Sequence, residues 1–503
     1  MPGYPRPDTV QPTPLADLAR TVNLPPPPSA DRVAITGVTH ASGSVRPGDL
    51  YAALPGSRRH GAEFIAEAAA AGARAVLTDP VGESAATAAG LPALVVPDPR
   101  RQLGKLAAQV YGDPTRTLTV LGVTGTAGKT STVYLMDAGL RAAGRRTGVI
   151  GTVETRLGER TVESVRTTPE APDLQALFAV ALEAGVDAVC MEVSSHALAL
   201  SRVEGTRFAV GGFTNLGLDH LDFHADVEEY FAAKAMLFDG RCQHEVVNLD
   251  DAAGRKLVTD RTVTISAAGD PAATWRAESI RPDGFGQTFT VVGPDEQRLS
   301  GAVRLPGVHN VSNALVALAS LVAMGVAPEV ALRGIAECPG VPGRLELVDA
   351  PGPVRGVVDY AHKPDAVTAV LTALRAVTPG RLLCVIGAGG DRDRAKRPLM
   401  GRAAAEAADV VVVTDDNPRT EDPAVVRAEV LAGARDAAGT ADVVEVAGRR
   451  AAIDEAVRRA NPGDTIAVLG KGHEQGQEVA GEIHPFDDRV ELAASLTERF
   501  AAQ

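Results

Sequence analysis

Residues 120–132 have the residue types and spacing of a phosphate-binding turn. An apolar stretch predicts a buried strand, Gly125 and Gly128 predict a tight turn after it, and a helix follows. Such a turn presents backbone N–H groups and the positive end of a helix dipole, and both attract phosphate oxygens. The Lys129 ammonium and the Thr130 hydroxyl open the helix, where they can bind terminal phosphates and a magnesium ion.

The strict phosphate-loop pattern has a glycine five residues before Gly128, where this chain has Val123. The alternative interpretation is therefore a glycine-rich turn between a strand and a helix that binds nothing. Because Lys129 and Thr130 follow the turn directly, we favour nucleotide binding. The nucleotide-binding residues predicted in this turn are Gly125, Thr126, Ala127, Gly128, Lys129, Thr130 and Ser131.

Carboxylates and imidazoles follow two further predicted strands beside this turn. Glu192 ends a buried apolar segment, and residues 219–224 contain two aspartates and two histidines. Open α/β sheets bind ligands at the carboxyl ends of their strands, and carboxylates and imidazoles are common metal ligands. The cluster predicts a metal site, and the alternative is that each residue only caps a helix or stabilises a turn.

Lys234 lies in the middle of an apolar stripe on a helix predicted over residues 226–238. The stripe recurs at helical spacing and consists of Val227, Tyr230, Phe231, Leu237 and Phe238. A lysine on a core-facing stripe must be paired or chemically altered, because burying a bare ammonium is unfavourable. In one interpretation its amine reaches water. In the other, the neutral amine takes up CO2 and the resulting carbamate becomes a negatively charged metal ligand.

Three predicted strand ends in the last third of the chain carry charges suited to a free amino acid. The residues are Arg392, Arg419 and Glu474. Guanidinium groups bind carboxylates in a fork, and a glutamate pairs with an ammonium, so the set predicts an amino-acid pocket. Ordinary surface salt bridges are the alternative interpretation.

Strands and helices alternate along most of the chain, which predicts an α/β fold with mostly parallel sheets. We expect three domains after a flexible, proline-rich leader over residues 1–30. A small α/β domain covers residues 31–115, and a central phosphate-loop ATPase domain covers residues 116–341. A C-terminal, Rossmann-like α/β domain covers residues 342–503.

The composition excludes several classes of protein. A net charge of −13 over 503 residues argues against a nucleic-acid surface, which needs basic patches. The four cysteines form no C-x-x-C pair, which fits a reducing cytoplasm and gives no sign of a disulfide or zinc site. The longest apolar run, over residues 314–327, is shorter than the roughly 20 residues that a membrane-spanning helix needs.

Together these segments resemble the Mur ligase family along nearly the whole chain. The matching segments are 122–132, 167–169, 191–196, 215–224, 309–313, 359–364, 389–393, 416–419 and 470–474. The resemblance implies a monomeric cytoplasmic enzyme that joins 2,6-diaminopimelate to UDP-N-acetylmuramoyl-L-alanyl-D-glutamate, two small-molecule substrates, in peptidoglycan precursor synthesis. It implies ATP and Mg2+ as cofactors, an acyl-phosphate intermediate and ADP as a product.

The resemblance also implies roles for individual residues. The catalytic residues are Lys129, Lys234 and His220. The metal ligands are Thr130, Glu192, His220 and Lys234, the last as N6-carboxylysine. Further ATP contacts are Asn310, Arg344 and Asp359. The UDP-linked substrate contacts Ser42, Thr167, Thr168, Ser194 and Arg202. The amino acid contacts Arg392, Asp416, Asn417, Arg419, Gly470 and Glu474.

The chain departs from the family pattern at three positions. Ala127 replaces a usual asparagine, Leu200 replaces a usual glutamine, and residues 41–43 are Ala-Ser-Gly where Asp-Ser-Arg is common. The rival interpretations are a related ligase that adds L-lysine or acts on folate, and an NTP-dependent regulatory protein. The Asp-Asn-Pro-Arg sequence at residues 416–419 favours diaminopimelate, and residue types do not distinguish its LL and meso forms.

Overall fold

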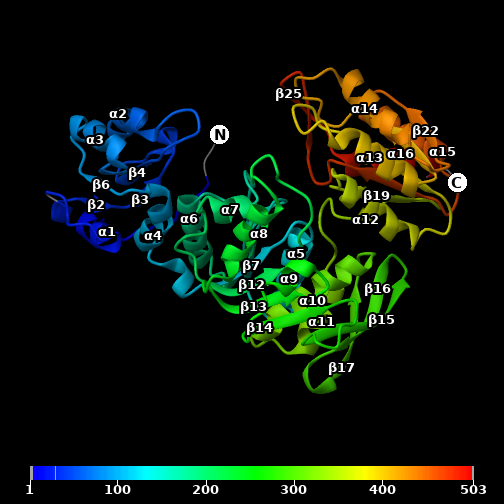
Figure 1. Cartoon of the computed structure of the whole chain (residues 1–503), viewed down its shortest axis with the longest axis horizontal. Helices are drawn as coiled ribbons and strands as arrows, with labels where there is room; N and C mark the ends of the chain where they lie inside the picture. The colour runs from blue at the N-terminus through cyan, green and yellow to red at the C-terminus, as the bar shows by residue number, and fades with distance from the viewer. Residues whose placement is uncertain (1–3, 29, 501–503) are drawn as a thin grey trace. The chain divides into compact units, whose positions relative to one another are not determined.

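The computed structural model describes residues 4–28 and 30–500 and confirms the predicted α/β fold class (Figure 1). The chain forms two compact units, each described here by itself. Within the described residues, the first unit comprises the chain up to residue 276 together with residues 292–297 and 312–335. The second comprises residues 277–291, 298–311 and the chain from residue 336 onward.

The first unit begins with a small parallel sheet in the order β3-β4-β5-β6. Its strands are β3 (Gly37–Thr39), β4 (Asp49–Ala53), β5 (Ala75–Thr78) and β6 (Ala93–Val95). The helices of this part are α1 (Leu15–Thr21), α2 (Ile65–Ala70), α3 (Glu83–Ala88) and α4 (Pro99–Val110). The buried apolar residues of α1 and α4 share a core with Ala176 and Ala179 of the following part, so the two parts pack together within this unit.

The prediction of a flexible leader over residues 1–30 is wrong for much of that range. Strand β1 (Thr13–Pro14) pairs with β2 (Ala34–Ile35), and helix α1 buries Leu15 and Leu18 completely. The apolar residues of this stretch recur at helical spacing, and burying them offsets the conformational entropy lost on ordering. The proline content hid this pattern because the proline-rich stretches flank the helix. The leader prediction also covers residues 1–3 and 29, which lie outside the described residues.

A larger sheet follows in the order β10-β9-β8-β11-β7-β12-β13-β14, parallel from β8 to β14. Its strands are β7 (Thr119–Thr124), β8 (Thr147–Ile150), β9 (Thr155–Leu157), β10 (Arg160–Val162), β11 (Ala188–Glu192), β12 (Phe208–Phe213), β13 (Cys242–Asn248) and β14 (Thr262–Ser266). The first strand of the series, β7, lies between β11 and β12, so the chain turns to opposite sides of it. Ligand sites of open α/β sheets lie at such a point.

The helices of this part connect the strands. They are α5 (Lys129–Ala142), α6 (Ala171–Glu183), α7 (Ser195–Ala199), α8 (Val227–Ala235), α9 (Ala252–Arg255), α10 (Val308–Ala323) and α11 (Pro328–Glu337). Three more strands fall in the stretch of sequence where the division between the units lies, namely β15 (Trp275–Asp283), β16 (Gly286–Val292) and β17 (Arg298–Val303).

The second unit contains a six-stranded sheet in the order β18-β19-β23-β20-β21-β22, in which only β18 is antiparallel to its neighbour. The strands are β18 (Glu346–Leu347), β19 (Arg355–Asp359), β20 (Leu382–Ile386), β21 (Val410–Val413), β22 (Asp442–Glu445) and β23 (Thr465–Leu469). The helices are α12 (Pro364–Arg375), α13 (Lys396–Ala407), α14 (Pro423–Arg435), α15 (Arg449–Arg459) and α16 (Asp488–Phe500), and a hairpin is formed by β24 (Gly476–Val479) and β25 (Glu482–Pro485).

A buried ion pair ties this sheet to its helices. The side chains of Arg449 and Asp488 are fully buried and lie 2.7 Å apart. The same guanidinium donates to the carbonyl oxygens of Leu469 and Asp415, which lie at the ends of β23 and β21. Although burial alone would lower it, the pKa of Arg449 is raised by the charge of Asp488. The pair therefore anchors the two strand ends that precede the predicted amino-acid site.

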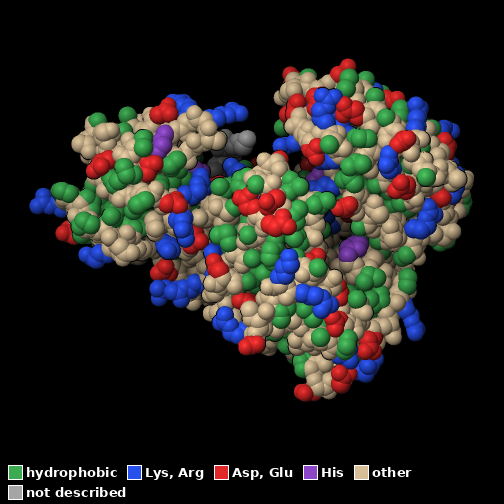
Figure 2. Space-filling model, viewed as in Figure 1, with side chains coloured by type: hydrophobic (Ala, Val, Ile, Leu, Met, Phe, Trp, Pro, Cys, Tyr) green, Lys and Arg blue, Asp and Glu red, His purple; other side chains and the backbone are tan. Residues whose placement is uncertain are grey.

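The surface carries both signs of charge. On the face of each unit seen in Figure 2, acidic and basic side chains are interspersed. Among the described helices, none combines the length and the apolar character that crossing a bilayer requires.

Candidate active site

The predicted phosphate loop lies between β7 and α5. Two of its residues must be glycines because other side chains approach them closely. Gly125 has a φ of 152°, and a Cβ there would lie 1.9 Å from Thr214 Oγ1. Gly128 has a φ of 84°, and a Cβ there would lie 2.3 Å from Asn313 Oδ1. Val123, which replaces the usual first glycine, lies within β7 and needs no special backbone conformation. The missing glycine is therefore compatible with a working loop.

Lys129 and Asn215 hold the loop in shape. The ammonium of Lys129 donates to the carbonyl oxygens of Gly125 (2.8 Å) and Thr126 (3.1 Å). From the strand end after β12, Asn215 accepts the N–H of Ala127 on its side-chain oxygen and the N–H of Thr126 on its carbonyl oxygen, both at 2.9 Å. The lysine charge is thus placed directly over the turn where phosphate binding is predicted.

Glu192 ends β11 and His220 follows β12, the two strands on either side of β7. Glu192 is 1% exposed at the end of β11, where one carboxylate oxygen accepts the N–H of Thr152 at 2.8 Å. His220, in the turn after β12, has a φ of 53°, and its Nε2 lies 3.0 Å from Asp219 Oδ2. The topology therefore brings both residues to the edge of the sheet that carries the phosphate loop.

Lys234 is buried, as the apolar stripe predicted. It is 1% exposed on α8, and its Nζ lies 4.2 Å from the centre of the Tyr230 ring. The Tyr230 hydroxyl is 3.1 Å from Thr126 Oγ1 in the phosphate loop. Burial this complete contradicts the interpretation in which the amine reaches water. That Lys234 is chemically altered stays a prediction.

Three histidines and Phe223 pack around the turn that follows β12. The ring of His196 stacks on Phe223 with centroids 4.1 Å apart and meets the ring of His220 edge-on at 4.7 Å. Burial, followed by the nearby charge of His224, lowers the pKa of His196 below its usual value. His224 Nε2 lies 3.0 Å from Ser195 Oγ, and burial also lowers the pKa of His224. The rings of His196 and His224 therefore favour their neutral forms.

Residues 4–28 and 30–500 contain no group of three or more His, Cys, Asp or Glu side chains arranged to hold a metal. The predicted ligand set includes only two side chains of these types, Glu192 and His220. Its other members are the Thr130 hydroxyl and a carboxylated Lys234. The predicted site therefore depends on the modification of Lys234 for its third charged or imidazole ligand.

Three of the predicted contacts for the UDP-linked substrate, Thr167, Thr168 and Ser194, lie at the end of β11. The buried hydroxyl of Thr168 donates to the Glu192 carbonyl oxygen (2.9 Å) and accepts the N–H of Ser194 (3.1 Å). Ser194 caps α7 by accepting the N–H of Ala197. Thr167 Oγ1 lies 3.0 Å from Thr152 Oγ1. Ser42 is half-buried at the start of a 3-10 turn (Ser42–Ser44) in the small sheet part of the same unit.

Arg202 is held by Glu170, a residue that sequence reasoning did not single out. Glu170 is 7% exposed, and it pairs with Arg202 (2.8 Å) and with Arg100 of α4 (3.1 Å). Burial raises the pKa of Glu170, but the positive charge of Arg202 and its neighbours brings the pKa below its usual value. The sequence did contain a signal for Glu170, because this residue directly follows Thr-Thr-Pro at residues 167–169. That segment is one of those that resemble the Mur ligase family.

Of the predicted ATP contacts in the second unit, Asn310 and Asp359 are buried and Arg344 is half-buried. Both carboxylate oxygens of Asp359 accept backbone N–H groups at 2.7 Å, from Leu345 and from Ala361, and burial raises the pKa of Asp359. The guanidinium of Arg344 lies 4.6 Å from the centre of the Tyr360 ring. Asn310, which is 2% exposed, donates to the Pro306 carbonyl oxygen. Their contact with ATP stays a prediction.

The predicted amino-acid residues lie together at the carboxyl ends of β20, β21 and β23. Asn417 donates to Glu474 Oε2 at 2.9 Å. Arg419, with a φ of 52°, donates to the Gly390 carbonyl oxygen at 2.7 Å, and its Nε lies 3.3 Å from Glu478 Oε2. The other three predicted residues, Arg392, Asp416 and Gly470, lie at the same strand ends. A Cβ on Gly470 would lie 2.4 Å from Asp416 Oδ2, and a Cβ on Gly389 would lie 3.9 Å from Arg392 Cγ.

Lys471 joins this corner, although sequence reasoning assigned it no role. Its side chain is fully buried, and its Nζ donates to Asn417 Oδ1 (3.0 Å), Glu474 Oε2 (3.2 Å) and the Gly476 carbonyl oxygen (2.6 Å). A signal existed in the sequence, because a rare lysine stands between two glycines at a strand end. The buried ammonium fixes the two side chains predicted to bind the amino acid.

Models of known protein families match the chain in three successive ranges. Models of the Mur ligase catalytic domain, the Mur ligase middle domain and the Mur ligase glutamate ligase domain match residues 34–111, 123–321 and 343–472. The chain is 54% identical over 503 residues to the UDP-N-acetylmuramoyl-L-alanyl-D-glutamate--2,6-diaminopimelate ligase of Streptomyces avermitilis, covering 98% of each chain. The chain belongs to the Mur ligase family.

Solved Mur ligases share the fold. One structure of a UDP-N-acetylmuramoyl-L-alanyl-D-glutamate--2,6-diaminopimelate ligase aligns with a TM-score of 0.71 and 29% identity, covering 97% of this chain and 99% of the other. The MurF ligase of Thermotoga maritima in complex with ADP aligns with a TM-score of 0.62 and 19% identity, covering 92% and 98%. Mur ligases are ATP-dependent and ADP-forming, so the predicted enzyme class is confirmed.

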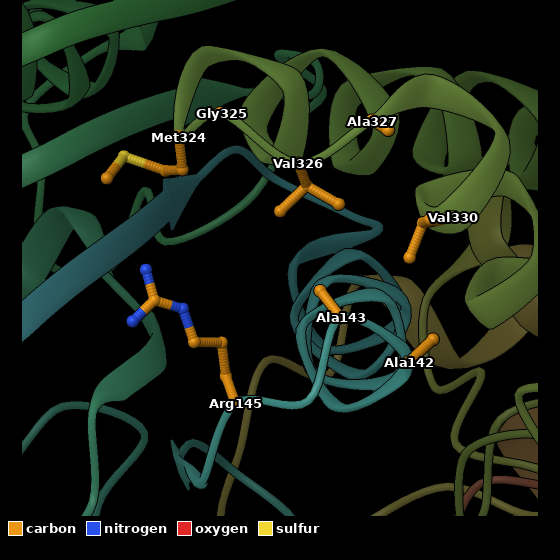
Figure 3. A pocket seen from close by; sticks show the side chains of 8 residues that line it. All are labelled: Ala142, Ala143, Arg145, Met324, Gly325, Val326, Ala327 and Val330. Carbon is orange, nitrogen blue, oxygen red and sulfur yellow. The ribbon is translucent and has the colours of Figure 1, made fainter.

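A hollow lies at the far end of α5 from the phosphate loop (Figure 3). Its lining residues are Ala142, Ala143, Arg145, Met324, Gly325, Val326, Ala327 and Val330. Because α5 runs from Lys129 to Ala142, the hollow is roughly 20 Å from the loop at the helical rise per residue. This Mur ligase therefore does not use it for nucleotide phosphates.

We expect Lys471→Met to weaken binding of the amino-acid substrate. The methionine keeps the length of the side chain but leaves Asn417 and Glu474 without their shared cation. Hydrogen bonds to charged groups contribute about 1.5–3 kcal/mol, so the KM for the amino acid should rise about 10- to 100-fold. Steady-state kinetics with each substrate varied in turn measures the effect.

The KM for ATP should stay within about twofold of wild type in the same variant. Lys256→Met is the matched control, because Lys256 is exposed and lies in the other unit. An unchanged KM for the amino acid in Lys471→Met would show that the buried lysine does not position the pocket.

Asp173, in the first turn of α6 next to Glu170, makes stability depend on pH. Burial, and then the negative charge of Glu170, raises the pKa of Asp173 from 3.8 to about 6. The folded state thus binds this proton more tightly than the unfolded chain. The stabilising contribution is present below about pH 4 and is lost as the pH rises through about 6.

We expect Asp173→Asn to raise the free energy of unfolding at pH 7.5 by about 1–2 kcal/mol relative to wild type, because no buried charge must form. At pH 4 the two proteins should differ little. Urea unfolding at both pH values measures this, with the exposed Asp260→Asn as control. A difference between variant and wild type that is equal at the two pH values would contradict the prediction.

Proposed function

We propose that the chain joins 2,6-diaminopimelate to the D-glutamyl residue of UDP-N-acetylmuramoyl-L-alanyl-D-glutamate, with cleavage of ATP to ADP and phosphate, in peptidoglycan precursor synthesis. The observation that carries the proposal is the 54% identity over 98% of the chain with a relative of that name. The Asp-Asn-Pro-Arg sequence at residues 416–419, which lies beside Glu474, supports it from the structure.

We infer three domains with separate tasks. Residues 31–115 bind the UDP-linked substrate, residues 116–341 bind ATP, and residues 342–503 bind the amino acid. The three family models match ranges that lie inside these limits. We also infer a monomer that works in the cytoplasm on small molecules. Four free and buried cysteines support a reducing compartment.

The phosphate loop suits an ATP phosphate chain. The two glycines allow the close approach of Thr214 and Asn313 that shapes the loop, and Lys129 supplies a positive charge at the start of α5. Mg2+ also suits the site, because the buried carboxylate of Glu192 and the hydroxyl of Thr130 are oxygen ligands of the kind it prefers. His220 and a carboxylated Lys234 would complete the set. When bound, Mg2+ offsets the negative charge that develops on the transferred phosphoryl group.

The reaction must first give the glutamyl carboxylate a leaving group. Transfer of the γ-phosphoryl group to this carboxylate gives an acyl phosphate. The amine of the incoming amino acid then attacks the acyl carbon, and phosphate leaves. Lys129 and the N–H groups at the start of α5 stabilise negative charge during the transfer. Arg419, Asn417 and Glu474 orient the amino acid, and good orientation lowers the barrier by up to about 7–11 kcal/mol.

We expect ADP release only when the nucleotide-peptide and an acceptor are both present. The test supplies ATP and UDP-N-acetylmuramoyl-L-alanyl-D-glutamate with LL-diaminopimelate, meso-diaminopimelate or L-lysine in parallel, and measures ADP. We expect release of ADP with diaminopimelate and not with lysine. The Lys129→Met variant should release no ADP with any of the three amino acids.

Two outcomes of this assay would contradict the proposal. Release with L-lysine alone would identify a lysine-adding ligase. Release of ADP without any acceptor would favour an NTP-dependent regulatory protein.

We expect Lys234→Arg to lower kcat about 100-fold, because arginine keeps the positive charge but cannot carry a carbamate. Carbon-13 NMR of the protein in labelled bicarbonate should show a carbamate resonance that the variant lacks. Lys256→Arg is the control. Wild-type turnover in Lys234→Arg would show that the modification is not part of the mechanism.

A further inference from the structure

Residues 4–12, here called the strap, begin in the core of the large sheet. Tyr4 is 9% exposed and packs with Leu118, Val120 and other residues of that core. Its hydroxyl oxygen accepts the backbone N–H of Val165 at 3.1 Å. Val165 is 53% exposed and lies two residues before Thr167, a predicted contact of the UDP-linked substrate. The first contact of the strap is therefore with one half of that site.

The next charged residue of the strap reaches the other half. Arg6 donates from Nη1 to both carboxylate oxygens of Asp49 (2.7 and 2.9 Å) and from Nη2 to the Ser44 carbonyl oxygen (3.3 Å). The same Asp49 carboxylate accepts the N–H of Arg46 at 2.8 Å. Arg6 thus holds the later part of the turn that begins at Ser42, directly at Ser44 and through Asp49 at Arg46. Ser42 is the predicted contact in the small sheet part.

The rest of the strap is fixed between these two contacts and α1. Glu183, the last residue of α6, accepts the N–H groups of Asp8 (3.1 Å) and Thr9 (3.2 Å). Strand β1 then pairs with β2. A segment held at successive points to both parts of the first unit limits how the two parts move against each other.

The Tyr4 contact adds little to global stability, because the N–H of an exposed residue such as Val165 would otherwise bond to water. Its effect is to select one conformation of the loop before α6. We propose that the strap positions both halves of the UDP-linked substrate site, with Tyr4 setting the loop at residues 163–167 and Arg6 setting the turn at residues 42–46. This inference rests on the proposed function, which makes these segments a substrate site.

The experiment compares Tyr4→Phe and Arg6→Gln with wild type. Each variant should raise the KM for UDP-N-acetylmuramoyl-L-alanyl-D-glutamate about three- to tenfold. Tyr4→Phe loses one hydrogen bond to its segment, and Arg6→Gln loses up to three. The KM for ATP, the KM for diaminopimelate and kcat should stay within about twofold. Arg20→Gln is the matched control, because Arg20 lies on the exposed face of α1.

Hydrogen–deuterium exchange of the protein without substrates provides a second readout, which does not depend on the reaction. Exchange should become faster at residues 163–168 in Tyr4→Phe only, and at residues 42–46 in Arg6→Gln only. Unchanged exchange in both segments would overturn the inference. It would also be overturned if the KM values for all three substrates rose together. Failure of the proposed function is seen separately, as the absence of ligation by the wild-type protein.

Discussion

The phosphate loop is fixed by its close approach to the strand end after β12, and the rest of the first unit's site depends on that contact. Parallel pairing of β7 with β12 brings Thr214 and Asn215 against the loop. A side chain at Gly125 would collide with Thr214, so only glycine permits this distance. The same loop contacts Tyr230, whose ring covers the Lys234 amine. The nucleotide site and the buried lysine therefore share one set of packed residues.

Cations predicted to bind anionic ligands already have partners inside the protein. Arg202 pairs with Glu170, Arg419 lies beside Glu478, and Lys129 donates to carbonyl oxygens of its own loop. A ligand that binds these groups exchanges one electrostatic contact for another, so the net gain in affinity is small. Such an arrangement favours selectivity, because a ligand of the wrong shape loses the internal pair without replacing it.

Most of the fold and much of the site could be predicted from local sequence. The alternation of strands and helices predicted the sheets, and the Gly-Lys-Thr turn lies where it was expected, between β7 and α5. The apolar stripe around Lys234 predicted its burial correctly. The leader failed as a prediction because proline content was weighed above the helical spacing of Leu15 and Leu18. Glu170 and Lys471 were missed because their roles lie in contacts with residues distant in sequence.

The sequence by itself determined which strand ends carry glycines and charged residues, because apolar runs followed by glycine and charge are local patterns. It also determined the family, through segments spread over nearly the whole chain. Only the tertiary structure decided which charges are neutralised internally and that Tyr4 and Arg6 reach the loop before α6 and the turn after Ser42. The Arg6–Asp49 and Tyr4–Val165 contacts join residues 43 and 161 positions apart, and strand order and packing, which no local pattern encodes, bring them together.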